Sequence, residues 1–192
     1  MTTQAAAELE HYRVDAAAST FKVQAFAGGL LSAFGHDPVF GVNDFQGEVQ
    51  FVAGSFANAS LKLVVKANSL AVVNDIKGKD RQDIERTMRN DVLETAKYPE
   101  IVFESNNVAV SRAANDRFRA RMIGNLTLHG VTQKNISLNC DVTLTAEGVR
   151  AKGGFALRQT DYNIKLVSVA GGTLKIKNEV KGAFDILARR AQ

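Results

Sequence analysis

The sequence is poor in cysteine and proline and contains no tryptophan: its 192 residues include one cysteine and two prolines. The single cysteine, Cys140, excludes an internal disulfide and a metal cluster built from cysteines. So few prolines argue against a disordered or linker-rich chain, and no stretch approaches the ~18 consecutive apolar residues that a membrane-spanning helix requires. With 45% hydrophobic and 23% charged residues, the composition is that of an ordinary soluble globular protein, and the length suits one domain.

Targeting signals and dense runs of positive charge are also lacking. The formal net charge is +4, without the clustered Lys and Arg of a nucleic-acid-binding protein, so we expect no nucleic-acid partner. Residues 1–10 contain no basic start followed by an apolar stretch, which a secretory leader would have. We therefore expect residues 1–10 to form a disordered tail and the protein to be cytoplasmic, or periplasmic if a leader has been removed.

What the sequence has in abundance is alternation of apolar and polar residues, the pattern of strands with one buried face. The clearest example is residues 135–146, where one face consists of Ile136, Leu138, Cys140, Val142, Leu144 and Ala146. Further segments with this pattern, or with strand-type composition, begin at Phe21, Phe45, Leu61, Pro99, Arg117, Val149 and Leu174. The last is interpreted as one strand over residues 174–186. We expect about eight antiparallel strands, because no helical crossovers separate them. A closed barrel and a sandwich are both compatible with this count, and strands of ten or more residues favour the barrel.

One segment has a different period. Between residues 74 and 94, Ile84, Met88 and Val92 recur every four positions among charged side chains. This spacing predicts an amphipathic helix over about residues 75–94. The helix would either plug one end of the barrel or act as a mobile lid that controls entry, and the pattern does not distinguish the two.

Sequence motifs for catalysis and cofactor binding are absent: there is no phosphate loop, nucleophile elbow, HExxH or dinucleotide fingerprint. The three histidines, His11, His36 and His129, lack the spacing of zinc ligands. We therefore expect no enzyme activity, no catalytic residue and no metal. No nucleophile accompanies His36–Asp37, which favours a hydrogen-bonded histidine at a barrel mouth over a general base. Asn178 falls on the inward face of its strand, where it would either bond the backbone at a bulge or contact a polar ligand head.

Several motifs, taken in order, resemble the YceI family of lipocalin-like proteins over about residues 11–188. They are YRVD at residues 12–15, FGHD at 34–37, YPEIVFES at 98–105, GNLTLHGVT at 124–132 and RQTDYNI at 158–164. The chain departs from the family pattern where Tyr12 replaces a tryptophan, and where Asn163 replaces a glycine next to an inserted residue. The resemblance implies a bacterial protein with an extended antiparallel barrel and a helix over it. It also implies a polyisoprenoid chain or isoprenoid quinone in the interior.

Together, alternation and resemblance predict a lipid-binding barrel over residues 11–192. Its expected function is non-catalytic binding, storage or transport of a long apolar ligand, with no cofactor other than that lipid. The alternative is a structural or stress-related interaction module with a filled core, since eight-stranded barrels occur in both forms. Transient membrane contact and a homodimer remain open. The predicted ligand-binding residues are Phe21, Phe51, Leu63, Phe103, Phe118, Met122, Leu138, Leu144, Phe155 and Phe184, with His36 and Asn178 as the polar members.

Overall fold

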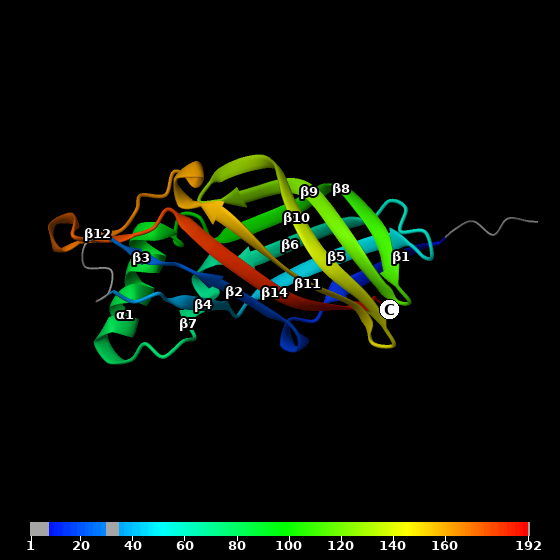
Figure 1. The fold of residues 1–192 in the computed structure, drawn as a ribbon, viewed down its shortest axis with the longest axis horizontal. Helices are drawn as coiled ribbons and strands as arrows, with labels where there is room; N and C mark the ends of the chain where they lie inside the picture. Colours follow the sequence, from blue (N-terminus) through cyan, green and yellow to red (C-terminus); the bar gives the residue numbers. More distant parts are fainter. Residues whose placement is uncertain (1–7, 30–34, 192) are drawn as a thin grey trace, which may run out of the picture.

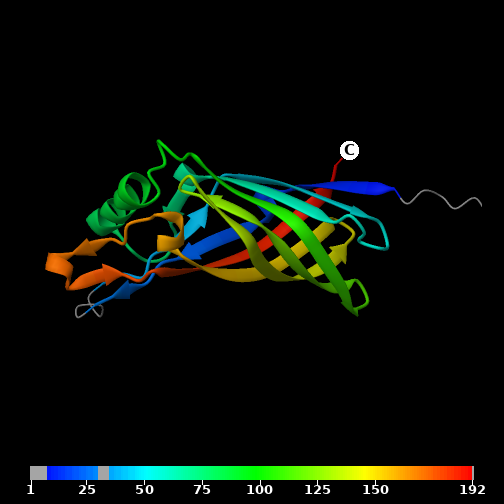
Figure 2. The same cartoon turned by 90° about the horizontal axis from the view of Figure 1, so that it is seen from above.

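Eight antiparallel strands close into an elongated barrel in the computed structural model, which describes residues 8–29 and 35–191 (Figures 1 and 2). Pairing between the first and last strands closes the ring. In their order around the barrel the strands are β1 (Leu9–Val14), β5 (Phe45–Val52), β6 (Ser60–Lys66), β8 (Glu100–Ala114), β9 (Arg117–Leu128), β10 (Val131–Thr145), β11 (Gly148–Arg158) and β14 (Glu179–Arg190). The predicted all-β antiparallel barrel is confirmed, and the sandwich alternative is wrong.

Part of the predicted tail and one residue of a motif lie outside the described residues. Residues 1–7 of the tail and Phe34 of the FGHD motif are among those not described. Strand β1 begins at Leu9, which places residues 9 and 10 in the barrel wall.

The four strands β8 to β11 have 11 to 15 residues each, long enough to line an extended interior. Strand β10 contains the alternating segment found in the sequence, and Cys140 is buried as its inward position requires. The strand starts four residues earlier, at Val131. The pattern conceals this because the register with β9 shifts between Gln133 and Ile136. Asn135, inside that shift, has a left-handed φ of 60°.

Three other strands are interrupted and continue as second segments on the same side of the barrel. Strand β1 resumes as β2 (Thr20–Gln24), β5 is preceded by β4 (Val39–Val42), and β6 resumes as β7 (Leu70–Val72). Pairing continues beyond the interruptions, because β2 pairs with β4 and β4 with β7, as β1 pairs with β5 and β5 with β6. The barrel is therefore extended toward one end by three short strand segments.

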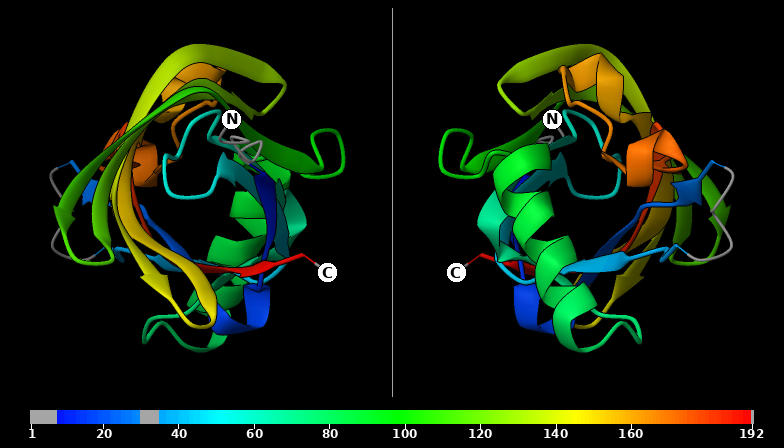
Figure 3. Two further views of the ribbon diagram at one scale, coloured as in Figure 1. Left: turned by 90° about the vertical axis from the view of Figure 1, so that its right-hand side faces the viewer. Right: turned by 90° about the vertical axis from the view of Figure 1, so that its left-hand side faces the viewer.

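The predicted amphipathic helix covers that extended end of the barrel (Figure 3). It comprises α1 (Gly78–Thr87) followed without a break by a π-helical turn over Met88–Val92, 15 residues in all. Met88 is buried in the core below, and Ile84 and Val92 pack against the same cluster. The apolar face predicted from the sequence is thus the face of the helix that is buried. No helix among the described residues is long and apolar enough to cross a membrane.

Side chains of the helix complete the hydrogen bonds of strand β7, whose outer edge pairs with no other strand of the described residues. The Glu85 carboxylate accepts a hydrogen bond from Val72 N at 2.8 Å, and the Arg81 guanidinium donates to Val72 O at 2.6 Å. Arg89 donates to Leu70 O at 3.4 Å. Burial opposes ionisation of Glu85, but the Val72 N–H and the two arginines outweigh it and hold its pKa below the usual value. These bonds hold the helix against the barrel.

The sequence prediction of one strand over residues 174–186 is wrong. The chain forms β13 (Leu174–Ile176) and then β14, with a break at residues 177–178. Strand β13 leaves the barrel and joins β12 (Ser168–Val169) and β3 (Ala27–Gly28) in a small second sheet. Gln159 secures the break by donating from Nε2 to Lys177 O and from N to Asn178 O, both at 2.9 Å. Alternation cannot reveal such a break, because each half keeps its own alternating pattern.

The bonds from the helix to β7 predict a measurable effect on stability. We expect Glu85→Ala to lower the free energy of unfolding by ~1–3 kcal/mol, because it leaves Val72 N–H without an acceptor. Because the pKa of Glu85 is lowered on folding, its contribution is complete above the unfolded value near 4.5 and is lost as the pH falls through the folded value. Urea unfolding at pH 7 and in acid measures both effects. Asp91→Ala, at an exposed position of the same helix, should change stability by less than ~0.5 kcal/mol; equal losses for the two variants would contradict the capping role.

Candidate functional site

The barrel interior contains two adjoining apolar cavities. The first, the barrel cavity, has a volume of about 500 Å³ and lies among the inward faces of the long strands. The second, the mouth cavity, has about 520 Å³ and lies between the barrel, the helix and the small second sheet. The same six side chains line both: Phe21, Val65, Ile101, Leu126, Phe155 and Leu157. The two spaces therefore meet at one ring of apolar residues, and together they run along the long axis of the molecule.

Phenylalanine–glycine pairs across strands β11 and β14 keep the barrel cavity open. Phe155 lies opposite Gly182 and Gly153 lies opposite Phe184. A Cβ atom on Gly182 would lie 2.0 Å from Cζ of Phe155, and one on Gly153 would lie 2.7 Å from Cζ of Phe184. Each ring therefore lies against the backbone of the neighbouring strand, in space that a side chain in place of the glycine would fill. Two large side chains thus line the wall without crossing the interior.

An aromatic cluster lies at the end of the barrel opposite the helix. Tyr12 stacks on Phe51 at a ring-centroid distance of 5.2 Å, Phe56 packs on Phe51 at 5.2 Å, and Phe118 packs edge-on against Phe56 at 4.6 Å. Phe51 and Phe56 line the barrel cavity. Phe56 has a left-handed φ of 54°, which is uncommon for a bulky residue. The β5–β6 loop therefore holds Phe56 with a strained backbone, and its ring lies at this end of the cavity.

The mouth cavity opens between the helix and the second sheet. Ile84 and Met88 line it from the helix, and Leu174 and Ile176 line it from β13. His36 lies at its rim and is exposed, with Nε2 3.2 Å from a carboxylate oxygen of Asp80 on the helix. His36 therefore lies at the mouth of the barrel and is within hydrogen-bond distance of Asp80.

Most of the predicted apolar site residues line the barrel cavity. Those that do are Phe21, Phe51, Leu63, Phe103, Met122, Leu138, Phe155 and Phe184. Phe118 and Leu144 do not: Phe118 packs behind Phe56, and Leu144 pairs with Val149 close to the β10–β11 turn. The pattern of alternation predicts which way a side chain faces, but not how far along the barrel the cavity reaches.

Asn178 lies outside both cavities and has a structural role. Its Oδ1 accepts a hydrogen bond from Thr160 N at 3.0 Å, and its Nδ2 donates to Thr160 Oγ1 at 2.8 Å. These bonds join the break before β14 to the 3-10 turn over Gln159–Tyr162. Of the two roles expected for Asn178, the structure shows the backbone hydrogen bond, and Asn178 is not among the residues that line either cavity.

The sequence did not indicate the role of His129, whose side chain is 9% exposed. Its Nδ1 lies 3.1 Å from Tyr162 O, and its Nε2 lies 2.5 Å from a carboxylate oxygen of Glu94. The ring of Tyr98 packs on it at 4.5 Å. Both ring nitrogens therefore lie within hydrogen-bond distance of an oxygen atom. His129 therefore joins the end of the helix to the β9–β10 turn.

The buried thiol and the acidic groups are the candidates for covalent or metal chemistry among the described residues. Burial raises the pKa of the Cys140 thiol to about 11, and the charge of Asp141 adds to the shift, so at neutral pH the nucleophilic thiolate is scarce. Among residues 8–29 and 35–191, no three His, Cys, Asp or Glu side chains are grouped to hold a metal ion. The arrangement is suited to enclosing an apolar molecule.

A closed eight-stranded antiparallel barrel with an apolar interior and a helix over one end defines a lipocalin-like β-barrel protein. The chain belongs to the YceI-like domain family, whose sequence model matches residues 12–188. The resemblance read from the motifs is thereby confirmed.

Solved structures share the fold at low sequence identity. A polyisoprenoid binding domain from Saccharophagus degradans has a TM-score of 0.65 at 19% identity, covering 96% of this chain and 100% of that one. BcnA of Burkholderia cenocepacia has a TM-score of 0.61 at 18% identity, covering 90% and 98%. The YceI protein of Campylobacter jejuni has a TM-score of 0.55 at 16% identity, covering 79% and 83%. No match was found among curated proteins.

The phenylalanine–glycine pairing predicts the effect of adding one methyl group. We expect Gly182→Ala to lower the free energy of unfolding by ~1–3 kcal/mol, because the new Cβ forces the Phe155 ring out of its place. In a Phe155→Leu background the same substitution should have a much smaller effect, since the obstructing ring is gone. A double-mutant cycle by chemical denaturation measures the difference. Additive effects would show that the two residues do not share this space.

Proposed function

We propose that the protein binds a long apolar molecule in its barrel, a polyisoprenoid chain or an isoprenoid quinone, and stores or transports it without chemical conversion. The proposal rests on the two adjoining apolar cavities, each within the range of ~300–1,000 Å³ that small-molecule sites occupy. The Saccharophagus degradans structure, described as a polyisoprenoid binding domain, supports this ligand class. The elongated interior suits a chain better than a compact molecule.

The energetics favour exchange with a membrane over one-way capture. Burying one CH₂ group is worth about 0.8 kcal/mol relative to water. The concentration of a long isoprenoid chain free in water is therefore negligible. A bilayer solvates the same chain as well as the barrel does, and net transfer between the two is close to neutral. A protein that exchanges such a ligand needs a mouth that reaches the membrane, and needs no catalytic group.

The mouth cavity is bordered by a segment suited to contact with an anionic membrane surface. This segment, the mouth hairpin, comprises residues 165–177 with strands β12 and β13. Its exposed face presents Lys165, Lys175 and Lys177, while Leu166 and Val169 are 38% and 49% exposed. Lysines beside exposed aliphatic side chains are the combination that binds peripherally to anionic bilayers.

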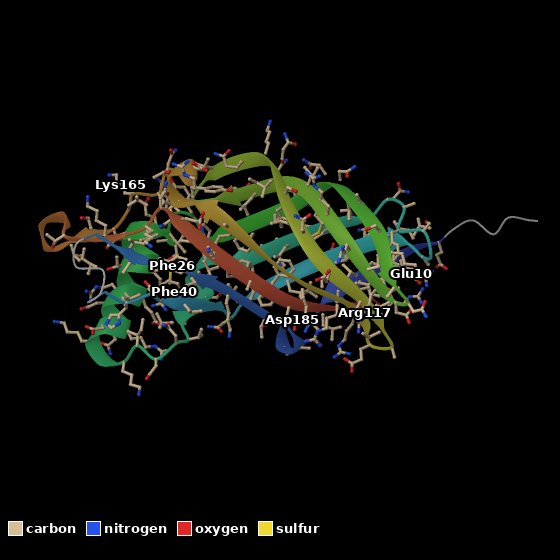
Figure 4. The ribbon with its side chains drawn as sticks, viewed as in Figure 1. Glu10, Phe26, Phe40, Arg117, Lys165 and Asp185 are labelled. Atoms are coloured by element: carbon tan, nitrogen blue, oxygen red, sulfur yellow. The ribbon has the colours of Figure 1, made fainter. Side chains whose placement is uncertain are left out.

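The helix on the other side of the mouth carries no net negative charge. Over residues 78–92, four acidic residues (Asp80, Asp83, Glu85 and Asp91) are balanced by four basic ones (Lys79, Arg81, Arg86 and Arg89). The lysines of the mouth hairpin form no ion pair with an acidic residue in the described part of the chain. Figure 4 places Lys165 at the mouth end and Arg117 at the far end of the long axis. We therefore infer that the mouth end faces the membrane during loading.

Filling the barrel cavity should displace the ligand without unfolding the protein. Met122 lines the barrel cavity, so we expect protein purified as Met122→Trp to contain several-fold less polyisoprenoid or quinone than wild type. After lipid removal the two should melt within a few degrees of each other, since a cavity can accept the indole. Mass spectrometry of organic extracts measures the lipid. Phe118→Trp, outside the cavity, is the control and should retain wild-type lipid. If wild type yields no lipid and Met122→Trp is unfolded, the interior is a filled core and the interaction-module alternative stands.

Membrane docking through the mouth predicts a position-dependent effect of charge. A lysine near an anionic surface contributes about 1 kcal/mol. The triple variant Lys165→Gln, Lys175→Gln, Lys177→Gln should therefore bind vesicles of phosphatidylglycerol and phosphatidylcholine about a hundredfold more weakly at low salt. Co-sedimentation measures the binding. The control removes the same charge at the far end, with Arg112→Gln, Arg117→Gln and Arg119→Gln, and should change binding much less. Equal losses in both variants would mean that overall charge, and not the mouth, determines binding.

A further inference from the structure

The rings of the aromatic cluster reach from one wall of the barrel to the other. Tyr12 lies on β1 and Phe118 on β9, and these strands are four apart in the closed ring of eight, which places them on opposite walls. The rings of Phe51 and Phe56 connect them, at centroid distances of 5.2, 5.2 and 4.6 Å from Tyr12 through to Phe118. Phe51 belongs to β5, whereas Phe56 comes from the β5–β6 loop. Phe56 therefore completes a row of rings across the interior.

The barrel cavity ends at this row of rings. Val14 of β1 lines the cavity, and Tyr12, the next residue of the strand that faces the same way, does not. On the opposite wall, Ala120 of β9 lines the cavity, and Phe118, two residues nearer the end, does not. Both walls thus stop lining the cavity where the aromatic rings begin.

Beyond the rings, the side of β1 that faces inward becomes polar. The Tyr12 hydroxyl donates to one carboxylate oxygen of Glu10 at 2.7 Å, and the Arg190 guanidinium lies 2.8 Å from the other. The Glu10 side chain is 15% exposed, and Figure 4 shows Glu10 at the end of the barrel away from the helix. A hydrocarbon chain that passed the rings would have to displace these polar contacts, which is unfavourable. The polarity of this end therefore adds to the barrier that the rings form.

The loop backbone holds the Phe56 ring in place. Phe56 N donates to Val52 O and Val52 N donates to Ala57 O, both at 2.9 Å, so hydrogen bonds secure the loop on either side of the ring. The left-handed φ of 54° is one that a bulky residue keeps only where its surroundings require it. A second left-handed residue of the loop, Asn58 with φ 55°, is exposed and lines neither cavity. Asn58 thus has the backbone conformation of Phe56 without its contacts.

We propose that Phe56 sets the length of the longest isoprenoid chain that the barrel can enclose. The chain enters tail first, because a polar head group would lose its hydrogen bonds in the apolar cavity, and its tail meets the Phe56 ring. A longer chain leaves its surplus units outside the mouth, in water once the protein has left the membrane, and each such unit loses the benefit of burial. The side chain of phenylalanine is somewhat larger than one isoprene unit, so its removal makes room for one more. This inference rests on the proposed binding function and adds a length limit to it.

Exchange of the Phe56 side chain tests the limit. Lipid-stripped full-length protein is incubated with phosphatidylcholine vesicles that contain an equimolar ladder of all-trans prenols, each one isoprene unit longer than the last. A second ladder consists of isoprenoid quinones with the same side chains. Mass spectrometry of the protein, after its separation from the vesicles, gives the lengths of the bound chains, and we expect a steep fall above one length in wild type. Phe56→Gly removes the ring and suits the left-handed φ, so binding of the first chain beyond that limit should increase about tenfold or more. Phe56→Trp should move the limit to shorter chains, and it decides on its own if the glycine variant does not fold.

Asn58→Gly is the matched control, since it relaxes the same loop and leaves the ring in place. It should keep the wild-type limit, and an equal shift in this variant would overturn the inference, because loop flexibility would then set the length. A limit that stays unchanged in both Phe56 variants, or a wild type that takes up all lengths alike, would also overturn it and leave the binding function intact. If wild type takes up neither prenols nor quinones of any length, the proposed function itself fails, and the length limit fails with it.

Discussion

Closure of the barrel at strand β14 is the constraint on which the rest of the structure depends. This strand pairs with β11 on one side and with both β1 and β2 on the other. The interruption between β1 and β2 is bridged at Ser19, whose hydroxyl accepts a hydrogen bond from Leu187 N at 2.9 Å. Arg189 donates to the Asp15 carboxylate at 2.6 Å and holds its pKa below the usual value. Closure leaves no free edge along the long strands, and it encloses the space that becomes the cavity.

The enclosed space stays open because its largest side chains lie against the wall. Phe155 and Phe184 each occupy the place that a Cβ would take on the opposite strand. Phe21, where the two cavities meet, packs edge-on against Phe45 and Phe155 at 6.2 and 6.0 Å. Fixed rings in a closed wall give a cavity of defined shape, which distinguishes this interior from a core that side chains fill.

The two ends of the barrel differ, and the difference gives the cavity a direction. Phe51 and Phe56 pack together and line the cavity at one end. The other end is extended by short strand segments whose exposed edge is completed by helix side chains, with the mouth hairpin beside it. A ligand would enter through the mouth, and its chain would extend toward the aromatic cluster at the other end. His129 lies where the helix end meets the β9–β10 turn, with Nδ1 near Tyr162 O and Nε2 near the Glu94 carboxylate.

The sequence by itself determined the fold class, the long strands, the face on which Cys140 lies and the apolar stripe of the helix. These depend on short-range periodicity, because a residue's neighbours in the chain decide which face it occupies. The break before β14 escaped detection, since the alternation continues through residues 177–178. Phe56 was not predicted as a cavity residue, because it lies in a loop, where no periodic pattern marks the inward side chains. Phe118 was predicted as a ligand-binding residue because its side chain faces inward, but its position along the barrel lies beyond the cavity. Only the tertiary structure decided where the cavity begins and ends and which ring lies over which glycine. Each of these depends on register and closure between distant strands, and local sequence pattern does not contain that information.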